Sequence, residues 1–541
     1  MNALASARPR HPIGGAWRSV FHKLGQLGGL AAVLVLLASA PLIFVLYHAL
    51  GLSAEQWAHL WQGRLPRLLW NTLSLAALVA LFSLVLGVSS AWLVARREFA
   101  GRRLAIWLLL LPLTIPTYVF AHIYTILLDS DGWLGLAWQA LFGDQASLPN
   151  LYSLGGTTFV LTLAGFSYVF LLVQAALGRS TQSLEEAARL QGARPGEIFR
   201  RINLPLLRPA IAAGLALIVL HVLSDFGAVS MLRYQTFTLS IYLQMSGRFD
   251  YQAAAGLSLV LVLLSLSFLV LERFFRKRQR YYAGAQTRQA PRKPARGWEL
   301  ALIWGWLGAI ALFGFLLPLA WMLAWSWEAW LGDYIDARFW SYAFNSGLVA
   351  FITASLTLLA AFPIALFHAR RQSALSQSFI HLSSIGFVLP GPVIALGILG
   401  FVLALLPPLY GTLGALVLAL TIRFLPLATQ AQEAALQQLT PSLEQAGRVL
   451  GAGPLENLWR VILPVIRGGL ASAWVLVFID ALKELPATLL LRPTGFDTLP
   501  VRIWIEASEE MLEMAAPAAL VLVLGTLPAI WIMLRSERRP A

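Results

Sequence analysis

Long apolar runs alternate with short polar, Arg-rich segments along most of the chain. A helix needs about 20 apolar residues to cross the hydrocarbon of a bilayer, so each run predicts one membrane-spanning helix. The pattern therefore predicts an all-α, polytopic membrane protein with about twelve such helices. Their expected ranges are 29–50, 70–95, 104–128, 157–178, 209–231, 253–271, 301–326, 346–367, 378–405, 411–429, 468–490 and 515–534.

Composition supports this interpretation, and the distribution of charge gives the orientation. The chain is 58% hydrophobic and only 12% charged, which is too little charge for a soluble domain of this length. If both termini are cytoplasmic, 31 of the 40 Lys and Arg residues fall in cytoplasmic segments and seven in outer loops. This is the positive-inside bias. The net charge of +14 therefore reflects membrane topology, and we expect no nucleic-acid partner.

Several kinds of chemistry are absent from the sequence. There is no cysteine, which excludes disulfides and thiolate metal sites. There is no Gly-x-x-x-x-Gly-Lys-Ser/Thr phosphate loop, and the histidines show no metal-ligand spacing. Residues 38–40 read Ala-Ser-Ala, like a signal-peptidase site, but the apolar run continues to Leu50, so we expect a retained first helix. The chain is predicted not to be an enzyme.

Two polar segments share one design. Residues 185–205 read EEAARLQGARPGEIFRRINLP, and residues 444–464 read EQAGRVLGAGPLENLWRVILP. A second set of matches lies at an offset of 274 and joins Asn71 to Asn345 and Pro116 to Pro390. Because each half repeats the same helix order, the sequence predicts a parallel repeat with a pseudo-two-fold axis along the membrane normal. At the offset of 259, the matches are Gly192 and Gly451, Pro195 and Pro454, Arg201 and Arg460, Pro205 and Pro464, and Arg208 and Arg467.

The repeat predicts a division of the chain into an N-terminal segment, two repeated transmembrane domains, and the parts that join them. The basic connector between the halves is expected to be a solvated cytoplasmic segment that touches anionic lipid heads. The expected ranges are 1–66 for the N-terminal segment with the first transmembrane helix, 67–272 for the first domain, 273–297 for the basic linker, 298–340 for the seventh helix and its outer loop, and 341–531 for the second domain.

Each repeated segment predicts two short helices joined by a sharp bend. Gly192 suits the C-terminal cap of the first helix, and Pro195 suits the first turn of the next, which should end near Pro205. One interpretation is an amphipathic interfacial segment. That interpretation leaves the repetition unexplained, whereas two equivalent protrusions suggest two equivalent partners.

The segment also carries a family signature. The order Glu-Ala-Ala, three residues, Gly, nine residues, Ile-x-Leu-Pro resembles the cytoplasmic loop of ABC-importer permeases. The first copy matches fully. The second has Gln445 in place of the Glu, Gly447 in place of the second Ala and Val461 in place of the Ile. The residues that correspond to the family's ATPase-coupling loop are Glu185, Glu186, Ala187, Gly192, Pro205, Glu444, Gln445, Gly451 and Pro464.

The resemblance implies a type I ABC permease fold with its two halves fused in one chain. It implies a multi-pass protein of the bacterial inner membrane, with two copies of an ABC ATPase subunit below it and a periplasmic solute-binding protein above. It also implies that this chain binds no cofactor, because ATP is used by the partner subunits.

Ionisable residues inside the membrane form a second candidate site. Asp225 and Glu484 are separated by 259 residues, and Lys483 and Asp480 lie beside the second acid. A charged side chain at a helix centre costs about 2.5–3.5 kcal/mol on insertion scales, so such groups need a partner or a wet cavity. The acids either cap a broken helix or pair with Lys483 or Arg423, or else they line a gate. An ion-coupled secondary transporter, with the two acids as proton or sodium sites, is the rival class.

The cargo is indicated by the third span and by two further stretches. Tyr118, His122 and Tyr124 are either buried helix contacts with satisfied hydrogen bonds or pathway donors, and their O and N atoms suit ferric ions. LSDFGAVSMLRYQTFTLSIY and KELPATLLLRPTGFDTLPVRIWIEAS resemble ferric-iron permeases. This resemblance implies import of ferric iron, with thiamine or another small solute as the alternative. No metal site is defined by the sequence.

Overall fold

The structure, a computed structural model, describes residues 13–143, 147–178, 182–277, 292–437, 439, 441–509 and 511–536. Within these ranges the chain is almost entirely helical, which confirms the all-α fold. The helices up to the linker are α1 (Ile13–Leu50), α2 (Ala54–Gly63), α3 (Leu65–Arg96), α4 (Arg102–Leu110), α5 (Thr117–Leu127), α6 (Trp133–Phe142), α7 (Leu154–Gly178), α8 (Gln182–Leu190), α9 (Pro195–Ile198), α10 (Leu204–Ser224), α11 (Gly227–Met231), α12 (Phe237–Ser246) and α13 (Tyr251–Lys277).

The part of the chain after the linker is built in the same way. Its helices are α14 (Trp298–Ala311), α15 (Leu317–Leu331), α16 (Ala337–Arg370), α17 (Ala374–Ser383), α18 (Ile385–Val388), α19 (Gly391–Leu405), α20 (Leu413–Leu436), α21 (Pro441–Val449), α22 (Pro454–Asn457), α23 (Leu463–Leu482), α24 (Pro486–Leu491), α25 (Leu499–Ser508) and α26 (Leu512–Ser536).

Nine helices of the described chain are long and apolar enough to cross a membrane, or ten if one bent pair counts as a single span. These coincide with ten of the twelve predicted ranges. The predicted span 515–534 falls on α26, whose apolar part is Met514–Pro528. The prediction of one continuous span over 378–405 is wrong, because the chain forms the three separate helices α17, α18 and α19 there.

Proline marks one break in each of two predicted spans, 104–128 and 378–405. The bent pair Arg102–Thr114 and Thr117–Leu127 meets at an angle of 99°. Pro116 precedes α5 with φ −60° and ψ 148°, and Pro390 precedes α19 with φ −59° and ψ 152°. A proline disfavours helical backbone in the residue before it, so each helix starts anew after this position. The two halves therefore break at equivalent residues.

The chain divides into two compact units that do not follow the two halves of the sequence. Unit 1 contains the second polar segment and the helices around it, and unit 2 contains the rest. Unit 1 comprises Met1–Ala40, Phe351–Phe387 and Leu420–Phe478, and unit 2 comprises Pro41–Ala350, Val388–Ala419 and Ile479–Ala541.

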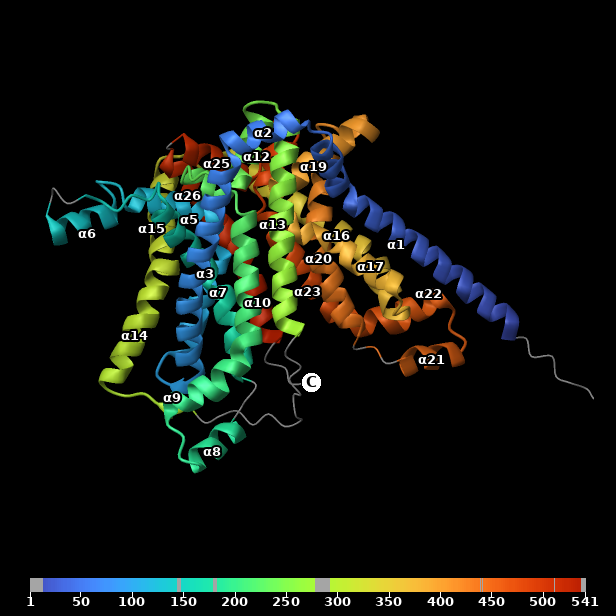
Figure 1. Ribbon diagram of the computed structural model, residues 1–541, viewed down its shortest axis with the longest axis horizontal. Helices are drawn as coiled ribbons and strands as arrows, with labels where there is room; N and C mark the ends of the chain where they lie inside the picture. Colours follow the sequence, from blue (N-terminus) through green and yellow to red (C-terminus); the bar gives the residue numbers. More distant parts are fainter. Residues whose placement is uncertain are drawn as a thin grey trace, which may run out of the picture. The chain divides into compact units, whose positions relative to one another are not determined.

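Three helices of unit 2, α3, α7 and α10, lie side by side (Figure 1). Glycine makes this close approach possible. A Cβ added at Gly87 of α3 would lie 2.7 Å from a side-chain atom of Val169, and one at Gly214 of α10 would lie 3.0 Å from the Val169 backbone. Small residues at helix contacts let backbones approach closely, and in lipid this packing replaces the hydrophobic force available in water.

Unit 2 also contains one contact of the repeat in both copies. Asn71 donates from Nδ2 to the carbonyl oxygen of Gln235 at 3.0 Å, and Asn345 donates to that of Asp497 at 3.0 Å. The two asparagines were matched by sequence, and their partners precede equivalent helices, α12 and α25. The contacts agree with the predicted internal repeat.

The end of the linker is held by ordered contacts. Strands β1 (Arg97–Glu98) and β2 (Lys293–Pro294) pair in parallel, and Trp304 donates to the carbonyl oxygen of Ala100 at 3.0 Å. Arg97 pairs with Glu299 at 2.6 Å. These contacts tie α14 to the end of α3. This end of the linker is therefore ordered yet mostly exposed, in agreement with a solvated connector, while its residues 278–291 lie outside the described chain.

Candidate coupling loops and membrane acids

The first polar segment bends at Gly192, as predicted. This glycine has φ +85°, in the left-handed region that favours glycine. The Gly192 amide donates to the carbonyl oxygen of Arg189 at 2.9 Å, and the Ala193 amide donates to the carbonyl oxygen of Ala188 at 3.0 Å. This pair of bonds is a Schellman motif, which ends α8 and satisfies two of its last carbonyls.

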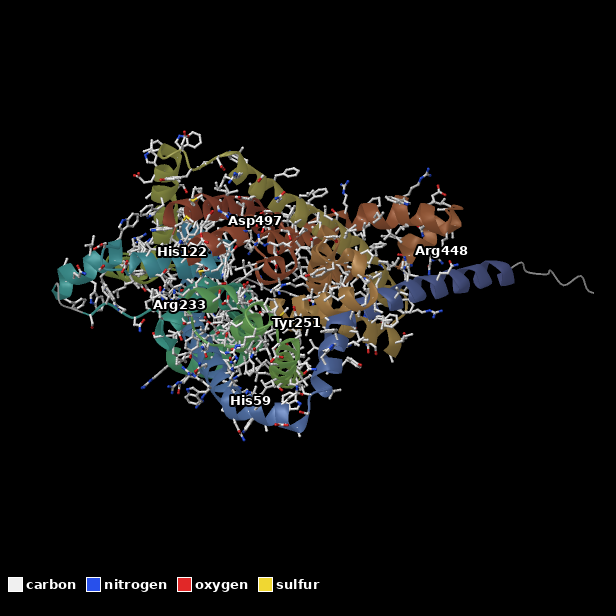
Figure 2. The ribbon with its side chains drawn as sticks, turned by 90° about the horizontal axis from the view of Figure 1, so that it is seen from above. His59, His122, Arg233, Tyr251, Arg448 and Asp497 are labelled. Carbon is white, nitrogen blue, oxygen red and sulfur yellow. The ribbon has the colours of Figure 1, made fainter. Side chains whose placement is uncertain are left out.

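The second polar segment has the same bend, in unit 1. Gly451 has φ +88°, its amide donates to Arg448 at 3.0 Å, and the Ala452 amide donates to Gly447 at 3.0 Å. Arg448 marks this helix, α21, in Figure 2. Every position is offset by 259 residues from its counterpart in the first segment. The two segments, hereafter the first and second coupling loops, thus have one backbone design.

The helix after each bend is longer than the sequence predicted. We expected a short second helix ending near Pro205, but α9 continues through a π-helical turn, Phe199–Asn203, directly into α10. The second loop has the equivalent turn, Leu458–Ile462, before Pro464. A proline ring clashes with the carbonyl four residues earlier, and a widened turn accommodates this clash without ending the helix.

Polar contacts hold the first coupling loop to α3. Arg96, the last residue of α3, pairs with Glu185 and donates to Asn203 Oδ1 at 3.1 Å. Arg189 lies 3.6 Å from the other oxygen of Glu185. Glu185 is only 6% exposed, whereas its neighbour Glu186 is exposed. The first acid therefore anchors the loop, whereas the second lies on the loop surface.

One of these contact positions is apolar in the second coupling loop. Ile462, at the position of Asn203, is buried in a cluster with Ala365, Leu436 and Ile466. The glycine at position 447, where the first loop has Ala188, also has a structural reason. A Cβ added there would lie 2.5 Å from the amide oxygen of Asn457. The departure from the family signature at this position makes room for that side chain.

Both coupling loops expose large apolar side chains. In the first loop Leu190 is 90% exposed, and in the second Val449 and Leu450 are 86% and 87% exposed. Leu184 and Leu443, again 259 residues apart, are exposed as well. Gln445 and Gly451 are exposed in the second loop, as are Ala187 and Gly192 in the first. Exposed apolar groups in a polar segment are typical of a docking surface.

Asp225 caps a short helix after the break in its span. The predicted span 209–231 ends at Ser224, and the carboxylate accepts hydrogen bonds from the amides of Ala228 at 3.0 Å and Val229 at 3.2 Å. The Thr117 hydroxyl donates to the same carboxylate at 2.5 Å. These bonds satisfy amides at the start of α11.

Glu484 caps the short helix that follows the equivalent break in the second half. The predicted span 468–490 ends at Leu482, and the carboxylate accepts from the amides of Ala487 and Thr488, each at 3.0 Å. The Thr488 hydroxyl adds a third bond at 2.9 Å. The capping hypothesis is therefore confirmed for both acids. Lys483 lies 3.7 Å from Asp480.

The three polar side chains of α5 are buried, but only one is satisfied. The Tyr124 hydroxyl donates to the carbonyl oxygen of Phe313. Neither the hydroxyl of Tyr118 nor Nε2 of His122 has a hydrogen-bond partner in the described structure. His122 lies on α5 in Figure 2, and its ring meets that of Trp321 edge-on with centroids 5.8 Å apart. The interpretation of all three as satisfied contacts is wrong for Tyr118 and His122.

The described residues contain no cluster of three His, Asp or Glu side chains that could hold a metal ion. Asp497 and Glu506, near and on α25, are paired with arginines instead. Asp497 pairs with Arg492, and Glu506 accepts from Arg502 at 2.8 Å. Burial raises the pKa of Glu506, and the adjacent Arg502 opposes this shift.

Sequence reasoning missed the partners of these groups. Asn203 and Thr117 lie 107 and 108 positions from the groups they bond. Nothing in the local pattern identifies such pairs. The bond between Thr488 and Glu484 is local by contrast, because the two residues are four positions apart.

The fold and these sites define a class: a multi-pass membrane protein with two repeated halves. Each half has one polar loop with a glycine bend and one broken span whose next helix is capped by a carboxylate. The family of binding-protein-dependent transport system inner membrane components matches residues 83–281 and 361–541. The chain belongs to this family, and it is a multi-pass ABC permease of the inner membrane. This membership excludes the rival class of secondary transporter.

Three relatives extend the comparison. The Fe(3+)-transport system permease protein FbpB 2 of Haemophilus influenzae is 31% identical over 492 residues, covering 90% of this chain and 93% of the relative. The putative ferric transport system permease protein FbpB 1 of the same organism is 27% identical, covering 82% and 73%. The ferric transport system permease protein FbpB of Actinobacillus pleuropneumoniae is 26% identical, covering 80% and 65%.

Proposed function

We propose that this chain forms the complete translocation pathway of an ATP-driven importer of ferric iron. The supporting observation is likeness over nearly the full length to permeases whose names specify Fe(3+) or ferric transport. Two copies of a separate ATPase subunit bind the coupling loops, and a periplasmic binding protein delivers the cargo. The chain itself holds no ATPase site, in agreement with its lack of a phosphate loop.

The coupling loops transmit ATPase closure to the membrane helices. The bends at Gly192 and Gly451 fix the direction of α8 and α21, and the exposed Glu186, Ala187 and Gln445 contact the ATPase. Glu185 holds the first loop to α3 through Arg96. Glu444 has the equivalent sequence position. Pro205 and Pro464 set the π-helical turns through which each loop continues into its span.

The gate lies where the two broken spans and α5 meet. The capped carboxylates of Asp225 and Glu484 fix the breaks, and Tyr118, His122, Tyr124 and Lys483 are the pathway candidates. Lys483 donates to the carbonyl oxygen of Leu113 at 3.4 Å, and a Cβ added at Gly227 would lie 2.9 Å from Cβ of Tyr118. The tyrosine hydroxyls and carboxylates are hard oxygens of the kind that Fe³⁺ prefers.

Both termini and the linker face the cytoplasm in this proposal, and the domain ranges are those expected from the sequence, 67–272 and 341–531. The 31-to-7 division of Lys and Arg supports the orientation. Reporter fusions at Ala285 and Gln145, which lie outside the described residues, test it. Opposite signals are expected, and the same signal at both positions would contradict the orientation.

Uptake by the reconstituted system tests the cargo. The chain is placed in liposomes with its ATPase and binding protein, and labelled ferric iron and labelled thiamine are offered separately. Iron uptake that requires ATP is expected. ATP-dependent uptake of thiamine without iron would overturn the cargo and leave the permease assignment intact.

A further inference from the structure

A large apolar cleft in unit 2 opens between α3, α10 and α14. Its volume is about 1330 Å³, above the roughly 300–1,000 Å³ of typical small-molecule pockets. The lining is almost wholly apolar and includes Val85, Trp92, Phe199 and Trp306, and the one charged lining residue is Arg208. Figure 1 shows α8 and α9 at the same end of α3 and α10, so the cleft lies at the loop end of these spans.

The dimensions of the cleft match one leaflet of a bilayer. It follows α3 from Leu84 to Leu93 and α10 from Leu204 to Leu215. At 1.5 Å per residue these stretches are about 14 and 16 Å long. Half of a hydrocarbon core of about 30 Å is about 15 Å. The cleft is therefore long enough to hold the acyl chain of a lipid in one leaflet.

The cleft also contains a positively charged side chain. Arg208 is exposed, and in the described structure its side chain has no ion pair or hydrogen bond. Arg200 and Arg201, exposed on the adjoining π-helical turn, add positive charge. Trp306 donates to the hydroxyl of Ser89 at 3.1 Å, which fixes one wall. A long apolar cleft that contains an unpaired arginine complements an acyl chain joined to an anionic headgroup.

We propose that this cleft binds one anionic phospholipid of the cytoplasmic leaflet, with its phosphate on Arg208 and an acyl chain along Trp92, Phe199 and Trp306. The assignment of the cleft to the cytoplasmic leaflet rests on the proposed orientation of the chain. The binding itself depends on neither the cargo nor ATP.

The site is linked to the first coupling loop. Trp92 meets Phe199 edge-on with centroids 5.0 Å apart, and the guanidinium of Arg96 lies 4.9 Å from the Trp92 ring centre. Arg96 in turn holds Glu185. A lipid against Trp92 and Phe199 therefore packs on the residues that position the loop. Occupancy should favour productive coupling, and this consequence rests on the proposed function.

Native mass spectrometry of the purified chain tests the binding. The probes are phosphatidylglycerol and phosphatidylcholine with identical acyl chains. We expect one retained phosphatidylglycerol, little phosphatidylcholine, and no displacement by inorganic phosphate. Arg208→Gln should weaken phosphatidylglycerol binding about fivefold, the effect of one cation near an anionic lipid surface. Arg467→Gln, the matched change in the second half, should not.

A second variant tests whether filling the cleft weakens lipid binding while the charge of Arg208 is kept. Ala212→Trp fills the cleft and keeps Arg208, and it should also lower retention of the lipid. Equal retention of both lipids, or retention unchanged in both cleft variants, would overturn the proposal. ATP-dependent uptake in liposomes with and without phosphatidylglycerol tests the consequence for coupling. Wild type should respond to the lipid and Arg208→Gln should not; binding without this response would overturn only the consequence.

Discussion

The two coupling loops have the same backbone but differ at one buried contact position. Each ends its first helix with a left-handed glycine and a Schellman motif, and each continues through a π-helical turn. The first is held to α3 by the polar group of Arg96, Glu185 and Asn203. In the second, the place of Asn203 is taken by Ile462, buried among apolar side chains.

This comparison indicates that both loops retain the bend while a buried contact position has changed. A duplicated element can replace a polar contact by packing if its outer surface is preserved. The exposed apolar residues Leu190 and Val449 are retained at equivalent positions, while the buried contacts have diverged. Of the two departures from the family signature, Gly447 is buried and Gln445 is exposed, so one exposed position has changed as well.

Removing the bend should have the largest effect. In Gly192→Pro the backbone cannot reach φ +85°, because proline fixes φ near −65°. We expect ATP-driven uptake to be abolished while the chain still inserts in the membrane. Gly305→Ala, at a glycine with open space around it, is the control and should transport normally. Normal uptake by Gly192→Pro would show that the bend is dispensable.

Charge reversal on the exposed surface should distinguish the two loops. Glu186→Lys replaces the acid of the full family signature, and we expect it to abolish uptake. Gln445→Lys acts where no acid is present, and we expect at most a roughly tenfold loss, or about 1.4 kcal/mol. Uptake by both variants is measured with the ATPase present at saturation. A larger loss for Gln445→Lys would reverse the assigned ranking of the loops.

Exchanging the anchors should loosen each loop separately. Glu185→Gln leaves the mostly buried Arg96 without its carboxylate, at a cost of about 3 kcal/mol. Ile462→Asn places an amide in an apolar cluster, at a cost of about 2 kcal/mol. Trypsin should cut the first loop faster in the first variant and the second loop faster in the second. Faster cleavage of both loops in either variant would argue against separate anchors.

A smaller effect is expected from restoring the signature in the second loop. Gly447→Ala brings a methyl group against the Asn457 amide oxygen and should destabilise the loop by about 1–2 kcal/mol. The double variant Gly447→Ala/Asn457→Ile copies Ala188 and Ile198 of the first loop and should recover stability. Protease resistance of the second loop measures both. Failure of the double variant to recover would show that another contact requires the glycine.

The bends and breaks could be predicted from sequence because single residues encode them. Gly192 and Pro116 act on their own backbone, so their effect is visible locally. The long-range contacts could not be predicted. The bond between Thr117 and Asp225 depends on how separate spans pack, and apolar patterns do not specify that packing. The predicted spans ran through Asp225 and Glu484 because hydropathy alone does not show that a carboxylate will cap a new helix.

The central claim is that both loops bind ATPase subunits, and the absence of cysteine from this chain allows a direct test. A photoreactive maleimide is attached to Glu186→Cys, to Gln445→Cys and, as a control on α12, to the exposed Leu243→Cys. After reconstitution with the ATPase and irradiation, the account predicts ATPase adducts at positions 186 and 445 and none at 243. No adduct at either loop, or equal labelling at position 243, would contradict it.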